Sequence, residues 1–284
     1  MTEPTPNLNP DIDTQRLLFI AGLHRSGTSL IHRCIADHPQ VSGFLGTGAP
    51  EDEGQHLQSV MRTAAEYGGP GVFGFDSASH LDDRSPSVSP DSAQRILNQW
   101  SVHWDLERRI LVEKSPPNLV RTRFLQALFP GCKFLVVLRH PVAVSLATRK
   151  WTTYLPMLRK LGVPDRRLPH ISVHRLMRHW LVCHERFERD LPYLDNVHVI
   201  RYEDFVDNPE KELGSIFDYL ELENAPLTQT IRSNVNDRYW DIWEARRSSA
   251  PTRWYDRRLV RRMESSMNRF GYSLTNRAAD AAPL

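Results

Sequence analysis

Short hydrophobic runs alternate along the chain with longer segments in which hydrophobic residues recur at helical spacing. Residues 17–21, 110–113, 134–138 and 197–201 are short β-rich runs, of which 17–21 and 134–138 are continuously apolar, and a weaker run lies at 41–44. Such runs are typical of strands buried on both faces. We expect helices at residues 28–37, 118–129, 141–151, 172–190 and 209–220, and a closing amphipathic helix from Leu259. This alternation predicts an α/β fold with a mostly parallel central sheet of about four to five strands.

The 284 residues suit one such domain, which we expect to span residues 16–274. The proline-rich residues 1–15 predict a disordered N-terminal tail, and residues 275–284 a short C-terminal tail. Segment 67–92 contains thirteen Gly, Ser or Pro among its 26 residues, and segment 155–170 contains three prolines. We expect both segments to be irregular surface loops that act as lids or shape a substrate pocket.

Charge and hydropathy exclude several classes of protein. With 36 Lys and Arg against 34 Asp and Glu, the net charge of +2 argues against nucleic-acid or lipid binding by bulk electrostatics. The longest run of apolar residues and glycine is seven, whereas a membrane span needs about 20. The N-terminal segment lacks the pattern of a signal peptide, so we expect a cytoplasmic location. Cys34, Cys132 and Cys183 have no CxxC spacing and are expected to be buried free thiols.

A glycine loop follows the first predicted strand and precedes the first predicted helix. Its sequence is Gly22-Leu23-His24-Arg25-Ser26-Gly27-Thr28-Ser29. Backbone N–H groups and a helix N-terminus bind anions in this setting, although such a loop can also simply join strand to helix. The pattern GxxxxGK[ST] of triphosphate-binding loops fits except that Thr28 replaces the lysine. Strand 134–138 is followed by Arg139 and not by a carboxylate that would hold magnesium, which indicates a nucleotide with less charge than a triphosphate.

This loop resembles the 5′-phosphosulfate loop of sulfotransferases that use 3′-phosphoadenosine 5′-phosphosulfate (PAPS). It is most similar to the branch with Arg-Ser-Gly-Thr, which includes tyrosylprotein sulfotransferases and many bacterial members. Other motifs of the family follow in order: Glu113-Lys114-Ser115-Pro116, Leu128-Phe129-Pro130, Leu138-Arg139-His140-Pro141, Arg201-Tyr202-Glu203-Asp204 and Phe270-Gly271-Tyr272. The resemblance covers most of the chain. It implies a P-loop NTPase-like core, PAPS as co-substrate, 3′-phosphoadenosine 5′-phosphate (PAP) as product, and no metal.

A second anion site is expected where Arg139 ends a buried strand and Pro141 begins a helix, because ligands bind at the carboxyl edge of such sheets. In the resembled family this arginine and a serine of the following helix bind the 3′-phosphate of the donor. The family spacing places that serine at Ala147, so Ser145 can serve only if the helix is locally shifted. A salt-bridged strand end is the structural alternative for Arg139.

The resemblance also implies the remaining donor and catalytic residues. Arg25, with the N–H groups and hydroxyls of Ser26, Gly27, Thr28 and Ser29, would bind the bridging and leaving oxygens. Lys114 would contact the sulfonate. Because the family uses a basic C-terminal loop for the 3′-phosphate, we add Tyr239, Arg246 and Arg247 as donor-binding candidates.

Two further groups of charged residues have mainly structural interpretations. Eight arginines lie between Arg246 and Arg269, and Arg257, Arg258, Arg261 and Arg262 flank an apolar stripe, as on a solvated helix face. Glu203 and Asp204 are expected to cap or brace the sheet edge.

An acceptor hydroxyl requires a general base. Residues 50–56 contain three carboxylates and an imidazole, and crowded like charges raise the pKa of a carboxyl group. We choose Glu53 as the base and keep Glu51, Asp52 and His56 as alternatives, while a solvated acidic turn is the structural interpretation.

The sequence therefore predicts a sulfotransferase that moves sulfonate from PAPS to a hydroxyl or amine acceptor by in-line displacement. The acceptor class stays open among small molecules, glycans and lipids, and so does the oligomeric state. The alternatives are a P-loop kinase or other phosphotransferase, and a nucleotide-binding protein without activity.

Overall fold

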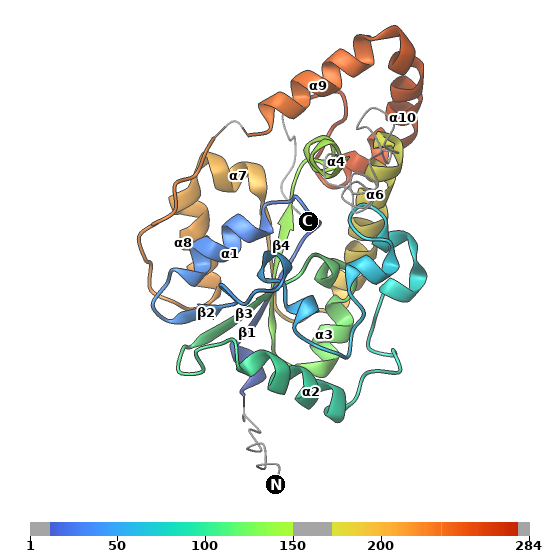
Figure 1. The fold of residues 1–284 in the computed structure, drawn as a ribbon. Helices are drawn as coiled ribbons and strands as arrows, with labels where there is room; N and C mark the ends of the chain where they lie inside the picture. The colour runs from blue at the N-terminus through green and yellow to red at the C-terminus, as the bar shows by residue number, and fades with distance from the viewer. Residues whose placement is uncertain (1–11, 150–171, 234, 278–284) are drawn as a thin grey trace.

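A five-stranded parallel sheet forms the centre of the fold (Figure 1). The computed structural model describes residues 12–149, 172–233 and 235–277. The strands are β1 (Leu17–Ala21), β2 (Val41–Gly43), β3 (Ile110–Lys114), β4 (Lys133–Leu138) and β5 (Val197–Arg201), in the order β2-β3-β1-β4-β5. All neighbours are parallel. The α/β class and all five expected strands are confirmed.

The strand register brings three sequence motifs to one edge of the sheet. Ile20 of β1 pairs with Lys114 of β3 and with Leu135 of β4. The loop after β1, the end of β3 and the residue after β4, Arg139, therefore leave the sheet at its carboxyl edge.

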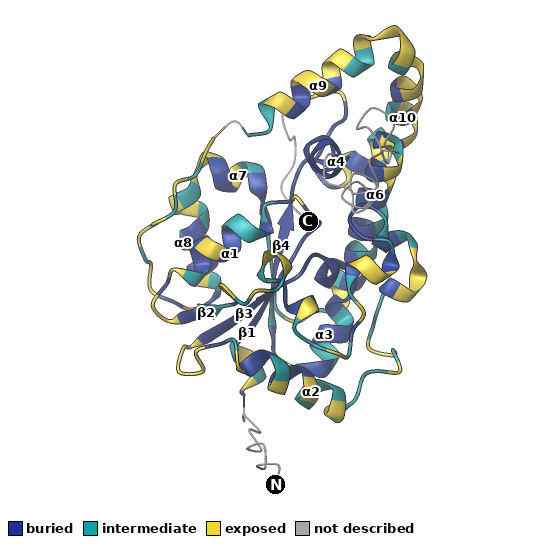
Figure 2. Ribbon diagram, viewed as in Figure 1, coloured by how far each residue is buried: buried dark blue, intermediate teal, exposed yellow. Residues whose placement is uncertain are grey.

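Helices cover both faces of the sheet (Figures 1 and 2). The helices α1 (Thr28–Ala36), α7 (Tyr202–Asp207) and α8 (Pro209–Tyr219) pack on one face with Leu18 and Ile20 of β1. The other face, with Leu17 and Phe19, is covered by α2 (Pro90–Ser101), α3 (Thr122–Leu128), α4 (Pro141–Arg149) and α6 (Val173–Asp190). The helices α9 (Asp237–Ser248) and α10 (Ala250–Asn268) extend this second layer. Alternation along β1 thus produces two apolar cores.

Several expected helices differ in extent. The expected helix 118–129 is divided into a 3-10 turn, Pro116–Val120, and α3, because Arg121 has φ −136° and leaves the helical region. The buried Arg121 guanidinium donates to the carbonyls of Ser79 and Arg62, which holds the chain in this turn. The closing helix begins at Ala250, nine residues before Leu259, and α2, α7 and α9 were not predicted.

Segment 67–92 does not lie only on the surface as expected. It is mainly irregular, but Phe73 and Ser79 are fully buried and Phe73 belongs to the core. Its ring contacts the buried rings of His24 and His179, so core packing explains this aromatic residue. The expected loop 155–170 and the end of the expected helix 141–151 lie outside the described residues.

The N-terminal boundary of the domain lies earlier than expected. Ile12 is buried, and Thr14–Arg16 forms a 3-10 turn with Asp13 as its N-cap, so residues 12–15 are not a disordered tail. Residues 1–11 and 278–284 lie outside the described part of the chain.

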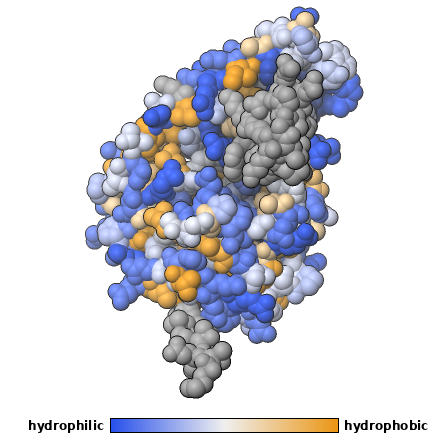
Figure 3. Space-filling view, viewed as in Figure 1, coloured by the Kyte–Doolittle hydropathy of each residue, from blue (hydrophilic) through white to orange (hydrophobic). Residues whose placement is uncertain are grey.

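For the described residues, the structure also shows the state of the cysteines, the polarity of the surface and the character of the helices. Cys34, Cys132 and Cys183 are free and buried, as expected. The visible surface is mostly hydrophilic, with separate hydrophobic patches (Figure 3). Within the described ranges, every helix is too short or too polar to span a membrane.

Candidate active site

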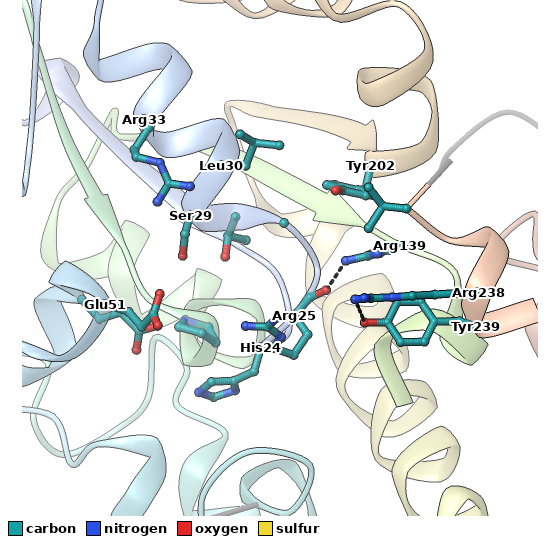
Figure 4. Close-up of a pocket in the computed structure, with 15 residues that line it drawn as sticks. His24, Arg25, Ser29, Leu30, Arg33, Glu51, Arg139, Tyr202, Arg238 and Tyr239 are labelled. Atoms are coloured by element: carbon teal, nitrogen blue, oxygen red, sulfur yellow. Dashed lines mark hydrogen bonds between the residues drawn. The ribbon is translucent and has the colours of Figure 1, made fainter. Parts of the chain in front are cut away.

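A cavity of about 270 Å³ lies at the carboxyl edge of the sheet (Figure 4). The β1–α1 loop and the first turns of α1 form one wall, and residues Glu51, Glu53 and Pro116 form a second. Arg139, Tyr202 of α7 and the start of α9 close the opposite side. Four arginines line this cavity, namely Arg25, Arg33, Arg139 and Arg238, so its electrostatics favour an anionic ligand.

The loop before α1 presents a helix N-terminus to the cavity. Gly27, with φ 97°, is the N-cap of α1, and Gly27, Thr28 and Ser29 all line the cavity. The first N–H groups of a helix have no partner within the helix and carry the positive end of its dipole. Arg25 adopts a left-handed backbone, φ 70°, which shapes the turn. The loop therefore offers backbone donors and a guanidinium to one ligand.

Ser26 does not take the position expected for a donor ligand. Its N–H donates to the Leu23 carbonyl at 2.9 Å and closes the turn. Its side chain is fully buried and does not line the cavity. Among the loop residues named from the sequence, the cavity is thus lined by Arg25, Gly27, Thr28 and Ser29 without Ser26.

Arg139 lies at the junction of the loop, α7 and α9. Its Nη1 donates to the Arg25 carbonyl at 2.7 Å, and its Nε and Nη2 donate to the Asn236 side-chain oxygen at 3.1 and 2.6 Å. The guanidinium stacks on the Tyr202 ring, 4.1 Å from the centroid. It is only 6% exposed, and burial lowers its pKa from the ordinary arginine value. A salt bridge is therefore not what holds this strand end; Arg139 is fixed by neutral acceptors and a ring.

Glu203 supports this arrangement from behind. It accepts hydrogen bonds from the His140 N–H at 3.0 Å, from Asn236 Nδ2 at 2.6 Å and from the Tyr272 hydroxyl at 3.0 Å. Through Asn236 it orients Arg139. The expected bracing role of Glu203 at the sheet edge is confirmed.

The predicted catalytic residues Glu53 and Lys114 form a buried ion pair. Lys114 Nζ donates to Glu53 Oε1 at 3.2 Å and to the Glu51 carbonyl at 2.8 Å. Lys114 is fully buried and Glu53 is 5% exposed, at the cavity wall. Gln55 Nε2 donates to the other carboxylate oxygen. Burial raises the pKa of Glu53, although Lys114 and Gln55 act against the shift and the Glu51 charge contributes least. Desolvation, and not crowding of like charges, is the main cause.

The alternative bases lie in different environments. Glu51 lines the cavity with a left-handed backbone, φ 54°. Asp52 turns away, because its carboxylate accepts from the N–H groups of Gly46 and Thr47 at 3.2 and 2.7 Å. Partial burial would raise the pKa of Asp52, but these bonds and the Thr47 hydroxyl lower it. Burial and the nearby Lys114 lower the pKa of His56.

Three other candidates are not part of this cavity. Ser145 is buried against a separate void of about 10 Å³, beside Leu23 and His179. Arg246 pairs with the buried Asp256 at 3.1 Å, and Arg247 donates to the Leu274 carbonyl at 3.5 Å. Among the C-terminal candidates, Tyr239 alone lines the cavity.

The sequence reasoning missed several residues of the cavity. Arg33 lies one helical turn after Ser29, so the i, i+4 spacing could have indicated it. Arg238 donates to the Tyr239 hydroxyl at 2.7 Å, beside the cavity (Figure 4). Asn236, which orients Arg139, belongs to a segment without a recognisable motif. Among the described residues, no group of three or more His, Cys, Asp or Glu side chains is arranged to hold a metal ion.

The chain is similar in sequence and fold to known proteins. A model of the sulfotransferase family matches residues 18–226. Sulfotransferase STF9 from Mycobacterium avium is 15% identical with a TM-score of 0.50, covering 84% of this chain and 70% of the other. A sulfotransferase from Alicyclobacillus acidocaldarius is 17% identical with a TM-score of 0.47, covering 88% and 95%. The sulfotransferase domain from the curacin biosynthetic pathway is 20% identical with a TM-score of 0.43, covering 76% and 78%.

Proposed function

The chain belongs to the sulfotransferase family, and from this premise we propose that it transfers sulfonate from PAPS to a hydroxyl or amine acceptor. The observation that carries the proposal is the anion cavity itself. One loop brings Arg25 and the N-terminus of α1 to the cavity, while Arg139 is fixed to the same loop through the Arg25 carbonyl. Two cationic sites held at a fixed separation suit a nucleotide with phosphate groups at both its 5′ and 3′ ends.

We assign the 5′-phosphosulfate to Arg25 and to Gly27, Thr28 and Ser29. In the transfer, the acceptor oxygen or nitrogen forms a bond to sulfur while the bond from sulfur to the bridging oxygen breaks. PAP leaves with an additional negative charge on its 5′-phosphate. Backbone N–H groups and a guanidinium stabilise that charge, and the loop supplies both at the cavity wall.

We assign the 3′-phosphate to Arg139 and the adenosine side of the cavity to Tyr202, Tyr239 and Arg238. Tyr202 already stacks on Arg139, so the ligand would meet a preformed wall and not a mobile side chain. Ser145 is left out of this assignment, because it contacts a different void.

We assign the proton transfer to Glu53 and the role of its ion-pair partner to Lys114, because Lys114 is fully buried and does not line the cavity. Glu53 accepts the proton of the acceptor as the new bond forms, and burial favours this by raising its pKa. Lys114 holds one Glu53 oxygen at 3.2 Å and lies behind it, so its ammonium charge is close to the reacting group. The class of acceptor stays open among small molecules, glycans and lipids.

Calorimetric titration with PAP and with ATP, each in the presence of a chelator, tests the donor assignment. We expect PAP to bind more tightly than ATP without magnesium. Tighter, magnesium-dependent binding of ATP would instead support a phosphotransferase.

Sulfonate transfer is then measured from labelled PAPS to a panel of phenols, amines, sugars and glycolipids. Labelled product from any of these acceptors supports the proposed activity. Binding of PAP without transfer to any acceptor would indicate a nucleotide-binding protein without activity.

A further inference from the structure

Helix α10 carries arginines that the donor cavity does not use. Of the eight arginines between positions 246 and 269, Arg246 pairs with Asp256, Arg247 donates to a backbone carbonyl, and Arg269 pairs with Glu185 and Glu188. The others, Arg253, Arg257, Arg258, Arg261 and Arg262, are exposed. The expected solvated helix face is therefore present.

Buried contacts hold one side of α10 against the rest of the protein, and these contacts determine which side of the helix faces solvent. Leu259, Met263 and Met267 are buried in the core. Asp256 is fully buried and lies 3.1 Å from Arg246 and 3.4 Å from His174. At about 100° per residue, these contacts leave Trp254, Arg257, Arg258, Arg261 and Arg262 on the opposite side, within an arc of about 140°. We call these five residues the arginine face.

An exposed aromatic residue lies at the N-terminal end of the arginine face. Trp254 is 59% exposed, and the Arg258 guanidinium carbon lies 5.6 Å from its ring centroid. The five other tryptophans in the described residues are all buried. Indole is amphipathic and prefers the boundary between water and lipid, where arginine also contacts headgroup phosphates.

The positive charge of the arginine face is not neutralised by the helix itself. Asp256 is buried, and the Glu264 carboxylate accepts from the Ser273 hydroxyl and the Leu274 N–H. Among the described residues, no carboxylate lies within ion-pairing distance of the four arginines of this face. These four arginines lie within one stretch of helix about 8 Å long, while the whole chain carries only +2. The charge is therefore local.

We propose that the arginine face of α10 docks on an anionic lipid bilayer. Figures 1 and 2 show α9 and α10 at the end of the molecule away from the N-terminus, with exposed residues along their outer sides. The arginines form two adjacent pairs one helical turn apart, and the exposed Trp254 indole precedes them by about one turn; an indole that can enter a fluid interface favours a lipid bilayer over a rigid polyanion. The Trp254 indole would enter the interface while the arginines bind phosphates.

Co-sedimentation with vesicles tests the proposal without reference to the sulfonate donor. The full chain is mixed with vesicles of phosphatidylcholine alone or of an equimolar mixture with phosphatidylglycerol. We expect sedimentation only with the mixture, and its loss at about 1 M salt, where the Debye length is only about 3 Å. Vesicles of the mixture should also shift the fluorescence of Trp254 to shorter wavelength, a change absent in Trp254→Phe.

A charge-reversal variant identifies the surface. Arg257→Glu with Arg258→Glu and Arg261→Glu should lower partitioning to the mixed vesicles at least about tenfold. The matched control reverses three exposed arginines elsewhere, Arg84→Glu, Arg95→Glu and Arg232→Glu, and should retain it. Thermal unfolding and PAP binding show that both variants fold.

Three results would overturn the proposal. The first is no sedimentation of the unmodified chain with the mixed vesicles, and the second is equal loss in both triple variants. The third is tighter binding of an RNA or DNA oligonucleotide than of the mixed vesicles at the same salt, which would assign the arginine face to a nucleic acid.

Discussion

Arg139 illustrates how one buried side chain serves both the fold and the cavity. It holds the Arg25 carbonyl at 2.7 Å and the Asn236 oxygen at 2.6 Å, and it also lines the cavity. Removing it therefore affects the loop and the ligand together. The two effects separate only when ligands with and without a 3′-phosphate are compared.

We expect Arg139→Ala to weaken PAP binding about ten- to a hundredfold, because a charge-assisted hydrogen bond contributes about 1.5–3 kcal/mol. The loss for 5′-AMP, which lacks the 3′-phosphate, should be several times smaller. Calorimetric titration of both nucleotides gives the comparison. Equal losses of affinity for the two ligands would mean that Arg139 supports the loop and does not bind the 3′-phosphate.

For Glu53, we expect Glu53→Gln to lower kcat about 10²- to 10⁴-fold with little change in PAP binding. Burial raises the pKa of Glu53, so activity of the unmodified enzyme should fall as pH decreases through a value above that of an ordinary glutamate. The variant should lack this acidic limb. The pH dependence of sulfonate transfer, with the best acceptor of the panel, is the measurement.

Glu51→Gln is the matched control, since Glu51 lines the same wall of the cavity. It should retain the acidic limb. If the limb disappears in Glu51→Gln and persists in Glu53→Gln, then Glu51 is the base.

Among the structural elements, the β1–α1 loop is shaped by contact with α7 as well as by its own sequence. Gly27 has φ 97°, a conformation that favours glycine. A Cβ atom there would lie 2.2 Å from Cδ2 of the Tyr202 ring, which itself packs against Arg139. The glycine is therefore required both by its positive φ and by the close approach of Tyr202 from α7.

We expect Gly27→Ala to cost at least about 3 kcal/mol of unfolding free energy and to abolish PAP binding, because the clash adds to the strain of a left-handed residue. Gly46→Ala is the control: Gly46 has φ 67° but open space where a Cβ would lie. It should cost only about 1–2 kcal/mol. Urea unfolding measures both, and equal costs would show that Tyr202 does not restrict this position.

On the scale of the whole molecule, burial keeps five imidazoles neutral. It lowers the pKa of His24, His32, His140 and His179 to about 3, and that of His184 to about 4. Unfolded histidines titrate near 6.5. Between these values the unfolded chain binds more protons than the folded chain, so stability decreases as pH falls below about 6.5. Three carboxyl groups oppose this, because burial raises the pKa of Glu113 to about 7 and also raises the pKa of Glu53 and Asp190, but they are fewer than the buried imidazoles.

We therefore expect the urea midpoint to fall strongly from about pH 7 to pH 5, with uptake of about four protons on unfolding near pH 5. His32→Gln should reduce that uptake by about one proton. Chemical denaturation at a series of pH values measures both quantities. A midpoint that is constant or rises toward pH 5 would contradict the buried neutral imidazoles.

The sequence was sufficient for the sheet and for the loop that begins the cavity. Short apolar runs are typical of strands buried between two layers of helices, and all five strands lie within one residue of the expected bounds. The order of glycine loop, Lys114 and Arg139 after successive strands likewise requires them to meet at one edge. Helices α2, α7 and α9 were missed. In α9 the buried residues Tyr239, Trp240 and Trp243 have helical spacing, but they are three aromatics within a strongly polar segment and do not continue over further turns.

What the sequence determined by itself is the set of groups with local causes: strands, the glycine loop, and the ends of strands that carry charged residues. Only the tertiary structure decided which of these groups share a cavity. It placed Arg33 and Arg238 there, set Ser26, Ser145, Arg246 and Arg247 outside it, and paired Glu53 with Lys114. The reason is physical: hydrogen-bond partners and desolvation depend on segments far apart in the chain, such as Arg139 and Asn236, and no local pattern encodes their approach.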